Sequence, residues 1–274
     1  MRLRLLAVAL AAAYVLHVTF WAPARNACAV LASMPRYPET LPRVVHMQWP
    51  AQRPMGAVQN KTYRAYARLF PGWELRVWDD AALERFMRDT FPGFAREVWA
   101  SFPHMIQRLD VARYLILFKY GGLYSDLDYE PLEYFGDLLS DQRVTLPESP
   151  IQHDEWVQNS LMASPRDHPV WLWVVQELEA RRGGASVPED TGCGMLSRVV
   201  RAHAEHVHVL PCEVFMRQAP LSFLQGDVLS ALVQKLIFPA LGWAKHCGAH
   251  GAPCMMAAHF GTSLRPAFTQ PPQL

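Results

Sequence analysis

Two aspartates, Asp126 and Asp128, stand two residues apart directly after the segment Leu123-Tyr124-Ser125. In an extended chain, residues i and i+2 point to the same face, so we expect both carboxylates on one side of a strand end. Asp-x-Asp pairs are common in solvated turns, but the largely apolar run before this pair predicts a buried setting. Carboxylate oxygens are hard ligands that suit Mg²⁺ or Mn²⁺, and these ions keep open positions for substrate phosphates. The pair therefore predicts a site for a metal ion and a diphosphate.

A helix is predicted immediately before this strand, over residues 104–120, because apolar residues recur there at three- and four-residue spacing. Asp110 and Arg113 are three residues apart, so their side chains leave the helix close together. Gly121-Gly122 is expected to end the helix, since glycine adopts a left-handed cap without strain. Asp110 and Arg113 thus form either part of the binding site or a buried ion pair that ties the helix to the sheet.

The segments around residues 43–48 and 75–78 are predicted strands, and those around residues 61–69 and 79–89 are predicted helices. An aspartate at the start of the second helix is a suitable N-cap. Strands that alternate with helices indicate an α/β fold with a largely parallel sheet, and ligands of such sheets bind at the carboxyl ends of the strands.

The block around the two aspartates reads Arg-x-Asp-x-x-Arg-Tyr on the helix and then Gly-Gly-x-Tyr-x-Asp-x-Asp. It resembles glycosyltransferase family 32, the DxD sugar-binding group that includes initiating mannosyltransferases and inositol-phosphoceramide mannosyltransferases. Other segments agree with the family in their order, and Cys193 stands where the family has the proline of a Thr-Gly-Pro turn. The matching positions are Arg108, Asp110, Arg113, Tyr114, Gly121, Gly122, Tyr124, Asp126 and Asp128, with segments 41–49, 73–80, 159–164, 168–171 and 191–194.

The resemblance implies a GT-A-type nucleotide-sugar fold with Mn²⁺ (or Mg²⁺) as cofactor. Asp128 would bind the metal directly, and Asp126 would contact the metal or the donor ribose; both would be catalytic. Binding of the nucleotide-sugar donor is implied for a larger set. Its members are His46, Gln48, Trp49, Arg108, Asp110, Arg113, Tyr114, Gly122, Tyr124, Asn159 and Ser263.

A third metal ligand is expected near the C-terminus, at His259, because the segment from Ala258 to Ser263 resembles the closing element of the family. Leu264 stands where tryptophan is usual. A lone histidine also occurs often in a purely structural role.

The implied reaction is the retaining transfer of a hexose, with mannose favoured and galactose or glucose as alternatives, to a glycan or glycolipid. Asp154 and Glu155 are candidates for contact with the acceptor, or are simply exposed loop acids. Residues 227–243 form an apolar stretch that reads as a buried helix or as a helix lying against a membrane beside a lipid acceptor. Inositol phosphoceramide is the alternative acceptor. A metal-dependent hydrolase and a catalytically inactive, membrane-tethered sugar-binding protein are the rival classes.

Length and composition fit one catalytic domain. The 274 residues are 51% hydrophobic, which argues against disorder, and the net charge of +1 gives no electrostatic case for nucleic acid. The sequence does not decide whether the chain acts with a partner subunit. The expected divisions are residues 1–24 as cytosolic tip and signal-anchor helix, 25–40 as stem, 41–265 as glycosyltransferase domain and 266–274 as a loose tail.

The N-terminal segment Leu5–Ala22 is apolar at nearly every position and follows Arg2 and Arg4. It approaches the length of a membrane-spanning helix, and the preceding arginines favour a cytosolic N-terminus. A cleaved signal peptide, with cleavage at Ala22-Pro23-Ala24, is the alternative. We therefore expect a single-pass type II protein of the Golgi or endoplasmic reticulum membrane, with a lumenal catalytic domain and an N-glycosylation sequon at Asn60.

The cysteines of a lumenal domain are expected to form disulfides. Cys193 with Cys212 and Cys247 with Cys254 are plausible pairs, while Cys28 lies beside the expected anchor. A zinc site is the weaker alternative, since its residue types suit zinc but their spacing follows no familiar pattern. Its residues would be His246, Cys247, His250 and Cys254.

Overall fold

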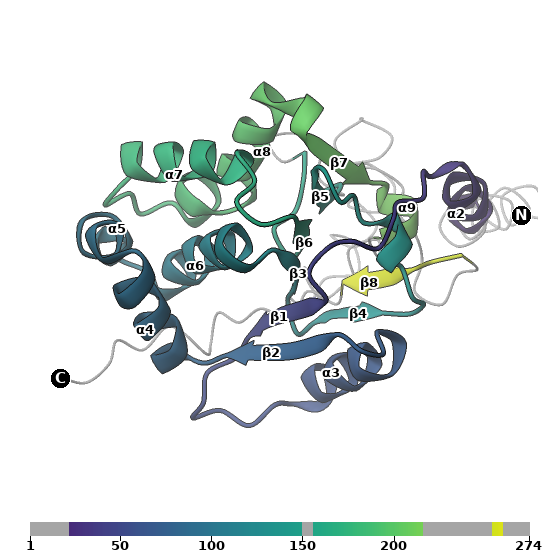
Figure 1. Cartoon of the computed structure of the whole chain (residues 1–274), viewed down its shortest axis with the longest axis horizontal. Coiled ribbons are helices and arrows are strands. Elements are labelled where there is room, and N and C mark those ends of the chain that lie inside the picture. Colours follow the sequence, from purple (N-terminus) through teal and green to yellow (C-terminus); the bar gives the residue numbers. More distant parts are fainter. Residues whose placement is uncertain (1–21, 150–155, 216–253, 260–274) are drawn as a thin grey trace, which may run out of the picture.

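The computed structural model describes residues 22–149, 156–215 and 254–259 (Figure 1). Side chains are described for all of these except 22–26 and 259. Several expectations concern residues outside these ranges and stay predictions. They are the anchor up to residue 21, the acceptor candidates Asp154 and Glu155, the stretch 227–243, Ser263 and the tail. Among the described residues, no helix has both the length and the apolar character needed to cross a bilayer.

A six-stranded sheet forms the centre of the described chain, with the strand order β2-β1-β3-β6-β5-β7. Every neighbouring pair is parallel except the two made by β6, which runs antiparallel to β3 and to β5. The expected α/β architecture with a mostly parallel sheet is therefore confirmed. The strands are β1 (Val44–Gln48), β2 (Glu74–Trp78), β3 (Gly122–Ser125), β5 (Val144–Pro147), β6 (Leu161–Ser164) and β7 (Val207–Leu210).

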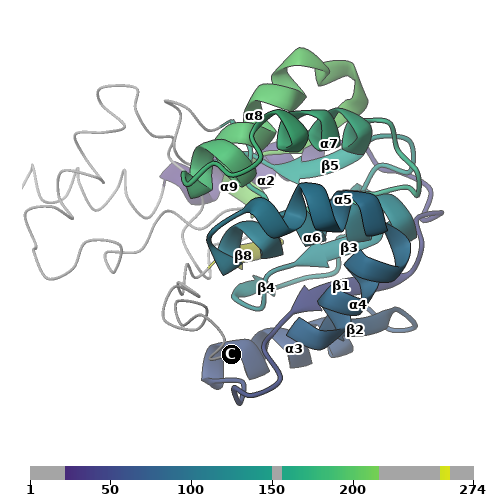
Figure 2. The same ribbon diagram turned by 90° about the vertical axis from the view of Figure 1, so that its left-hand side faces the viewer.

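Helices cover both faces of this sheet (Figures 1 and 2). One apolar core lies between the sheet and helices α4 to α8, and the other lies between the sheet, α3, α9 and the N-terminal helix α2. The helices are α2 (Ala22–Ser33), α3 (Ala57–Leu69), α4 (Asp80–Thr90), α5 (Pro92–Glu97), α6 (Met105–Tyr120), α7 (Val170–Ala180), α8 (Cys193–Ala202) and α9 (Cys212–Phe215). Shorter helical turns are η2 (Trp99–Ser101), η3 (Gly136–Leu138), η4 (Val187–Thr191) and η5 (Ala204–His206).

The local signals identified in the sequence lie where they were expected. Asp79 caps α4, since its carboxylate accepts a hydrogen bond from the amide of Ala82 at 2.7 Å. Gly121 and Gly122 end α6 and have positive φ angles of 62° and 89°. A Cβ atom on Gly122 would stand 2.6 Å from the carbonyl oxygen of Val44, so only glycine lets β3 lie this close to β1.

A second, two-stranded sheet pairs β4 (Tyr129–Pro131) with β8 (Ala257–His259) in antiparallel register. The amide of Met256 also donates to the carbonyl of Val214, and the amide of Leu132 donates to the carbonyl of Met256. These bonds bring the C-terminal segment next to the chain that follows the two aspartates.

One disulfide joins Cys28 to Cys254 and links helix α2 to the segment before β8. Both plausible pairings from the sequence are therefore wrong, because Cys254 is taken by Cys28 and Cys193 is a free thiol. The zinc alternative loses Cys254 for the same reason. The predicted stem contains most of α2, which packs on the domain through buried Ala27 and this disulfide.

Histidine His46 on β1 is fully buried and joins three elements. Its Nδ1 lies 3.1 Å from Nε1 of Trp78, and its Nε2 lies 3.1 Å from the carbonyl oxygen of Gly121. Indole N–H groups only donate, so Nδ1 must accept and the ring proton must sit on Nε2, where it donates to Gly121. Burial lowers the pKa of His46 to about 4, and the bond to Gly121 opposes this shift only partly.

We therefore predict that His46 makes stability depend on pH below neutrality. Its folded pKa lies below the unfolded value of 6.5, so the unfolded state binds more protons between these two pH values. The contribution of His46 to the free energy of unfolding should then rise by about 3 kcal/mol from pH 4 to 6.5 and stay constant above that. Urea unfolding of the wild type and of His46→Asn across this range measures the effect. An equal slope in both proteins would show that another group is responsible.

Candidate functional site

The two aspartates lie in a tight turn between β3 and β4. The amide of Tyr129 donates to the carbonyl of Asp126 at 2.9 Å, and the amide of Asp126 donates to the carbonyl of Ser160 at 2.8 Å. The expectation of an extended segment with both acids on one face is therefore wrong, because the chain turns directly after β3. The turn still lies at the carboxyl end of a central parallel strand, where ligands of such sheets bind.

The carboxylate of Asp126 is held from two sides. The hydroxyl of Tyr124 lies 2.7 Å from one carboxylate oxygen and 3.3 Å from Oε1 of Gln48. A phenol has one proton, and the shorter bond to a charged acceptor is the stronger, so Tyr124 donates to Asp126. A guanidinium nitrogen of Arg113 lies 3.4 Å from the same oxygen and 3.5 Å from the other.

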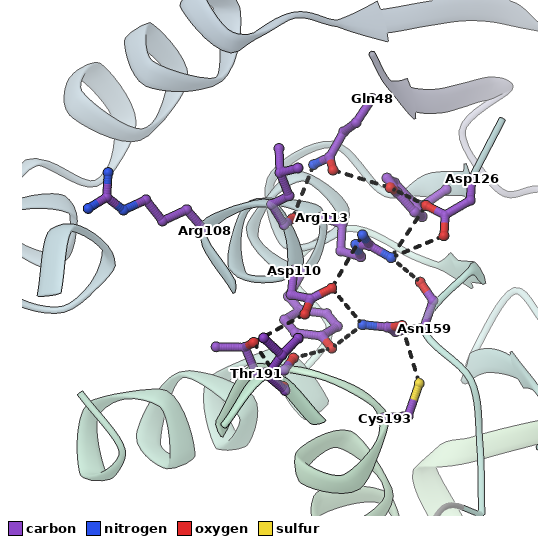
Figure 3. A network of polar contacts seen from close by, with 12 residues as sticks. Gln48, Arg108, Asp110, Arg113, Asp126, Asn159, Thr191 and Cys193 are labelled. Carbon is purple, nitrogen blue, oxygen red and sulfur yellow. Dashed lines mark hydrogen bonds and ion pairs between the residues drawn. The ribbon is translucent and has the colours of Figure 1, made fainter. Parts of the chain in front are cut away.

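Arg113 connects the helix to the turn (Figure 3). It is 2% exposed, and its guanidinium reaches Asp110 at 3.3 Å, Asp126 at 3.4 Å and the carbonyl oxygen of Asn159 at 3.0 Å. The guanidinium carbon also lies 4.9 Å from the ring centre of Tyr124, a cation–π distance. Burial opposes the positive charge, but Asp126, Tyr124 and Asp110 together raise the pKa of Arg113 above its usual range. Its Nε is buried without an acceptor among the described residues.

A ring of hydrogen bonds fixes Asp110 on the other side of Arg113. One carboxylate oxygen accepts from the amide of Asn159 at 3.0 Å, and the other accepts from the hydroxyl of Thr191 at 3.1 Å. The amide of Asn159 also donates to the hydroxyl of Tyr114, which donates to the carbonyl of Thr191. Burial raises the pKa of Asp110 to about 6 against the opposing charge of Arg113 and these bonds.

A cysteine completes the contacts of the Asn159 side chain. The amide nitrogen faces Asp110, whose carboxylate only accepts, and the thiol of Cys193 lies 3.3 Å from Oδ1 on the other side (Figure 3). Thr191 and Cys193 belong to the Thr191-Gly-Cys-Gly turn, to which the sequence assigned no chemical role. Its resemblance to a Thr-Gly-Pro turn was the one signal that could have drawn attention to these two residues.

Three of the expected donor-binding residues lie apart from this network. His46 is buried with both ring nitrogens used inside the protein, so it has no group for a ligand. Trp49 is 6% exposed in the apolar core, and its indole nitrogen donates to the carbonyl of Arg53. Arg108 points away from Arg113 and donates to the carbonyls at the end of η2 (Figure 3). The structure therefore does not bring these three residues to the aspartate turn.

Two further predicted donor-binding residues have structural roles. Gly122 begins β3, at the opposite end of the strand from the aspartates, and its constraint is the close approach of Val44. Tyr114 is fully buried and stacks on Trp171 at 5.8 Å, and its hydroxyl belongs to the ring of hydrogen bonds around Asp110. Gln48 does lie at the network, where its amide donates to the carbonyl of Leu109.

The residues at the turn suit a divalent metal ion. Asp128 is 8% exposed, and Asp126 is oriented by Tyr124 and Arg113. The strand register pairs the backbone of Tyr129 with that of His259, which places His259 one residue from Asp128 along the ladder. The two carboxylates match the preference of Mn²⁺ or Mg²⁺ for oxygen ligands. In the described part of the chain, another cluster of metal-binding types joins Glu148, Cys212 and Glu213, but Cys212 is disulfide-bonded and offers no thiolate.

Tyr124 should tune the affinity of this site for a metal. We expect Tyr124→Phe to weaken Mn²⁺ binding 10- to 100-fold, because the variant loses the donor that orients Asp126. Calorimetric titration of Mn²⁺ measures the change. Tyr66→Phe is the matched control, since the equally buried hydroxyl of Tyr66 donates to Ser125, one residue before the turn, at 2.9 Å. An equal loss of Mn²⁺ affinity in both variants would contradict the role given to Tyr124.

Comparison with known proteins finds a family model and several relatives that match part of this chain. Residues 56–145 match the family model described as glycosyltransferase sugar-binding region containing DXD motif. Inositol phosphoceramide mannosyltransferase 1 of Schizosaccharomyces pombe is 33% identical over 150 residues, which cover 53% of this chain and 45% of that protein. Mannosyl phosphorylinositol ceramide synthase CSH1 of Saccharomyces cerevisiae is 27% identical over 158 residues, which cover 57% of this chain and 40% of that protein. The chain thus spans less than half the length of these two relatives.

Among solved structures, mouse xyloside xylosyltransferase 1 in its apo form aligns with 88% of this chain and 93% of its own. The sequence identity is 14% and the TM-score is 0.45.

Proposed function

We propose that this chain, whose residues 56–145 match the family model of the DXD-containing glycosyltransferase sugar-binding region, is a metal-dependent hexosyltransferase that uses a nucleotide sugar. Mannose is the favoured sugar, and the acceptor is a glycolipid of the inositol phosphoceramide type. The relatives named above act, by their names, on this class of lipid. The observation that carries the proposal is the turn at the end of β3, where Asp126 is oriented by Tyr124 and Arg113.

The turn and β8 would hold the metal. We assign Asp128 as the first metal ligand, Asp126 in the orientation held by Tyr124 and Arg113 as the second, and His259 from the adjacent strand as a further one. When bound, Mn²⁺ supplies positive charge that offsets the charge developing on the departing nucleoside diphosphate.

The remaining polar network would receive the donor sugar and ribose. Arg113 brings a fixed positive charge beside Asp126, and the Asn159–Thr191 ring keeps Asp110 in one orientation. Groups fixed in this way need no reorganisation when a ligand arrives, which is the main electrostatic advantage of an enzyme site.

In the reaction that the family resemblance implies, the bond between the sugar C1 and the phosphate oxygen breaks as the acceptor oxygen bonds to C1 on the same face. The acceptor hydroxyl proton passes to the departing phosphate. This route needs positioning and electrostatic stabilisation from the protein and no enzymatic nucleophile.

The location in the secretory pathway and the N-terminal anchor are part of the same proposal. A lipid acceptor lies in a membrane, and an anchored catalytic domain would be confined to the surface of that membrane. The apolar segment before residue 22 supports this placement by its length and its flanking arginines.

A panel of donors and acceptors tests the proposed function. The full chain would be incubated with Mn²⁺ and GDP-mannose, UDP-galactose or UDP-glucose, with inositol phosphoceramide or a free oligosaccharide as acceptor. We expect nucleoside diphosphate release from GDP-mannose that inositol phosphoceramide stimulates, together with a mannosylated lipid. Donor binding without turnover under all conditions would instead favour a sugar-binding protein.

A further inference from the structure

Charge is distributed unevenly along this nearly neutral chain. Residues 50–73 contain Arg53, Lys61, Arg64 and Arg68 and no acidic residue. The rest of the chain holds 22 of the 26 Lys and Arg residues against all 25 Asp and Glu residues. This segment consists of the loop after β1 and helix α3. Such a local excess of one sign indicates an interaction surface when the side chains share one face.

The three cations of α3 do share one face. Lys61, Arg64 and Arg68 are all exposed, and their spacing of three and then four residues places them within an arc of about 60° on the helix. Thr62, Ala65 and Tyr66 form the buried side. The basic α3 face, by which we mean Lys61, Arg64 and Arg68, extends over about 10 Å at 1.5 Å per residue.

This face lies beside the candidate site. Helix α3 packs on β4, the strand that follows the aspartate turn (Figures 1 and 2). Lys61 makes an ion pair at 3.0 Å with the buried carboxylate of Glu130 on β4. The helix begins after the loop that leaves β1 at Gln48, a member of the polar network. The N-terminal end of α3 is thus at the same edge of the sheet as the turn.

We propose that the basic α3 face docks on an anionic lipid bilayer. The neighbouring exposed residues Ala57, Asn60 and Ala67 are short, so the long basic side chains extend beyond them. A row of cations on one helix face fits the plane of anionic headgroups, and each cation near such a surface contributes about a fivefold gain in binding. Nucleic acid is the less suitable partner, since the face offers no exposed aromatic ring for base stacking. The inference holds whether or not the aspartate turn transfers a sugar.

Vesicle binding by the full chain tests this inference. The variant Arg64→Gln/Arg68→Gln leaves the ion pair between Lys61 and Glu130 in place and is expected to fold normally. The readout is the ratio of its affinity for vesicles with 30% phosphatidylserine to its affinity for pure phosphatidylcholine vesicles, so that any contribution of the apolar N-terminal segment cancels. We expect the ratio to fall about 30-fold relative to the wild type, and the wild-type ratio to fall with added salt.

The matched control is Arg182→Gln/Arg201→Gln, which removes the same charge from two exposed arginines near α7 and α8, on the far side of the sheet from α3 (Figure 2). It should keep the wild-type ratio. An equal fall in both double variants, or no fall in the first, would overturn the proposal. The glycosylation expected at Asn60 and the docking of this face exclude each other, because Asn60 shares the exposed face of α3 and a glycan there would hold a bilayer away. An N-glycan found on Asn60 in protein from a secretory host would therefore also overturn the proposal.

Discussion

Replacing Asp128 by asparagine is expected to lower metal-dependent sugar transfer about 1000-fold or more. The neutral amide is a poor ligand for a hard cation, and the loss of the metal removes several kcal/mol of charge stabilisation from the departing diphosphate. Each 1.4 kcal/mol of lost stabilisation lowers the rate tenfold. The fold should survive, because Asp128 lies in a turn and the variant keeps the shape of the side chain. Nucleoside diphosphate release at saturating donor, with Mn²⁺ varied, measures the effect.

The control for this variant is Asp89→Asn, which makes the same chemical change at an exposed position of α4 whose side chain is 65% accessible. It should keep wild-type activity and the wild-type dependence on Mn²⁺. Full activity of Asp128→Asn with an unchanged Mn²⁺ dependence would remove Asp128 from the metal site.

Replacing Arg113 by methionine is expected to lower the free energy of unfolding by about 3–5 kcal/mol, because the change leaves buried carboxylates without their shared cation. Asp110 and Asp126 both form ion pairs with this guanidinium, and Asp110 is buried, so water cannot replace the lost cation there. Stabilities of whole domains are only about 5–15 kcal/mol, so the variant should unfold at much lower urea concentration. Donor binding should be lost as well, since Asp126 loses one of its two anchors.

Two comparisons separate the effect of the unpaired buried charge from the effect of lost packing. Arg108→Met on the same helix removes an arginine that donates only to carbonyls near η2, and it should cost far less stability. In Arg113→Met the pKa of Asp110 should rise above about 6, so lowering the pH to 5 should protonate this residue. The difference in the free energy of unfolding between this variant and the wild type should then become smaller. A gap that stays constant or widens on acidification would show that lost packing, and not an unpaired charge, destabilises the variant.

The elements that the sequence predicts well depend on neighbours in the chain. Helix α6 and its end at Gly121 follow from apolar spacing and a glycine pair, and α4 follows from its Asp79 cap. The sequence also predicts that Arg108 and Arg113 point in different directions. Five residues at 100° each place the two arginines about 140° apart, so one helix cannot aim both at one ligand.

The features that the sequence does not predict depend on distant segments. The Cys28–Cys254 bond joins residues 226 positions apart, and nothing near either cysteine selects the other. The pairing of β4 with β8 involves two strands of three residues each, too short for a recognisable alternation. His46 follows the same logic, since its burial became evident only when Trp78 and Gly121 were seen on either side of it.

The central claim is that the turn of Asp126 and Asp128 binds a nucleotide sugar through a divalent cation. Calorimetric titration of GDP-mannose into the full chain, with Mn²⁺ and then with EDTA, tests this claim most directly. Binding that requires Mn²⁺, disappears with EDTA and is absent from Asp128→Asn is the predicted result. Binding that EDTA leaves unchanged, or no binding of GDP-mannose, UDP-galactose or UDP-glucose in the presence of Mn²⁺, would contradict it.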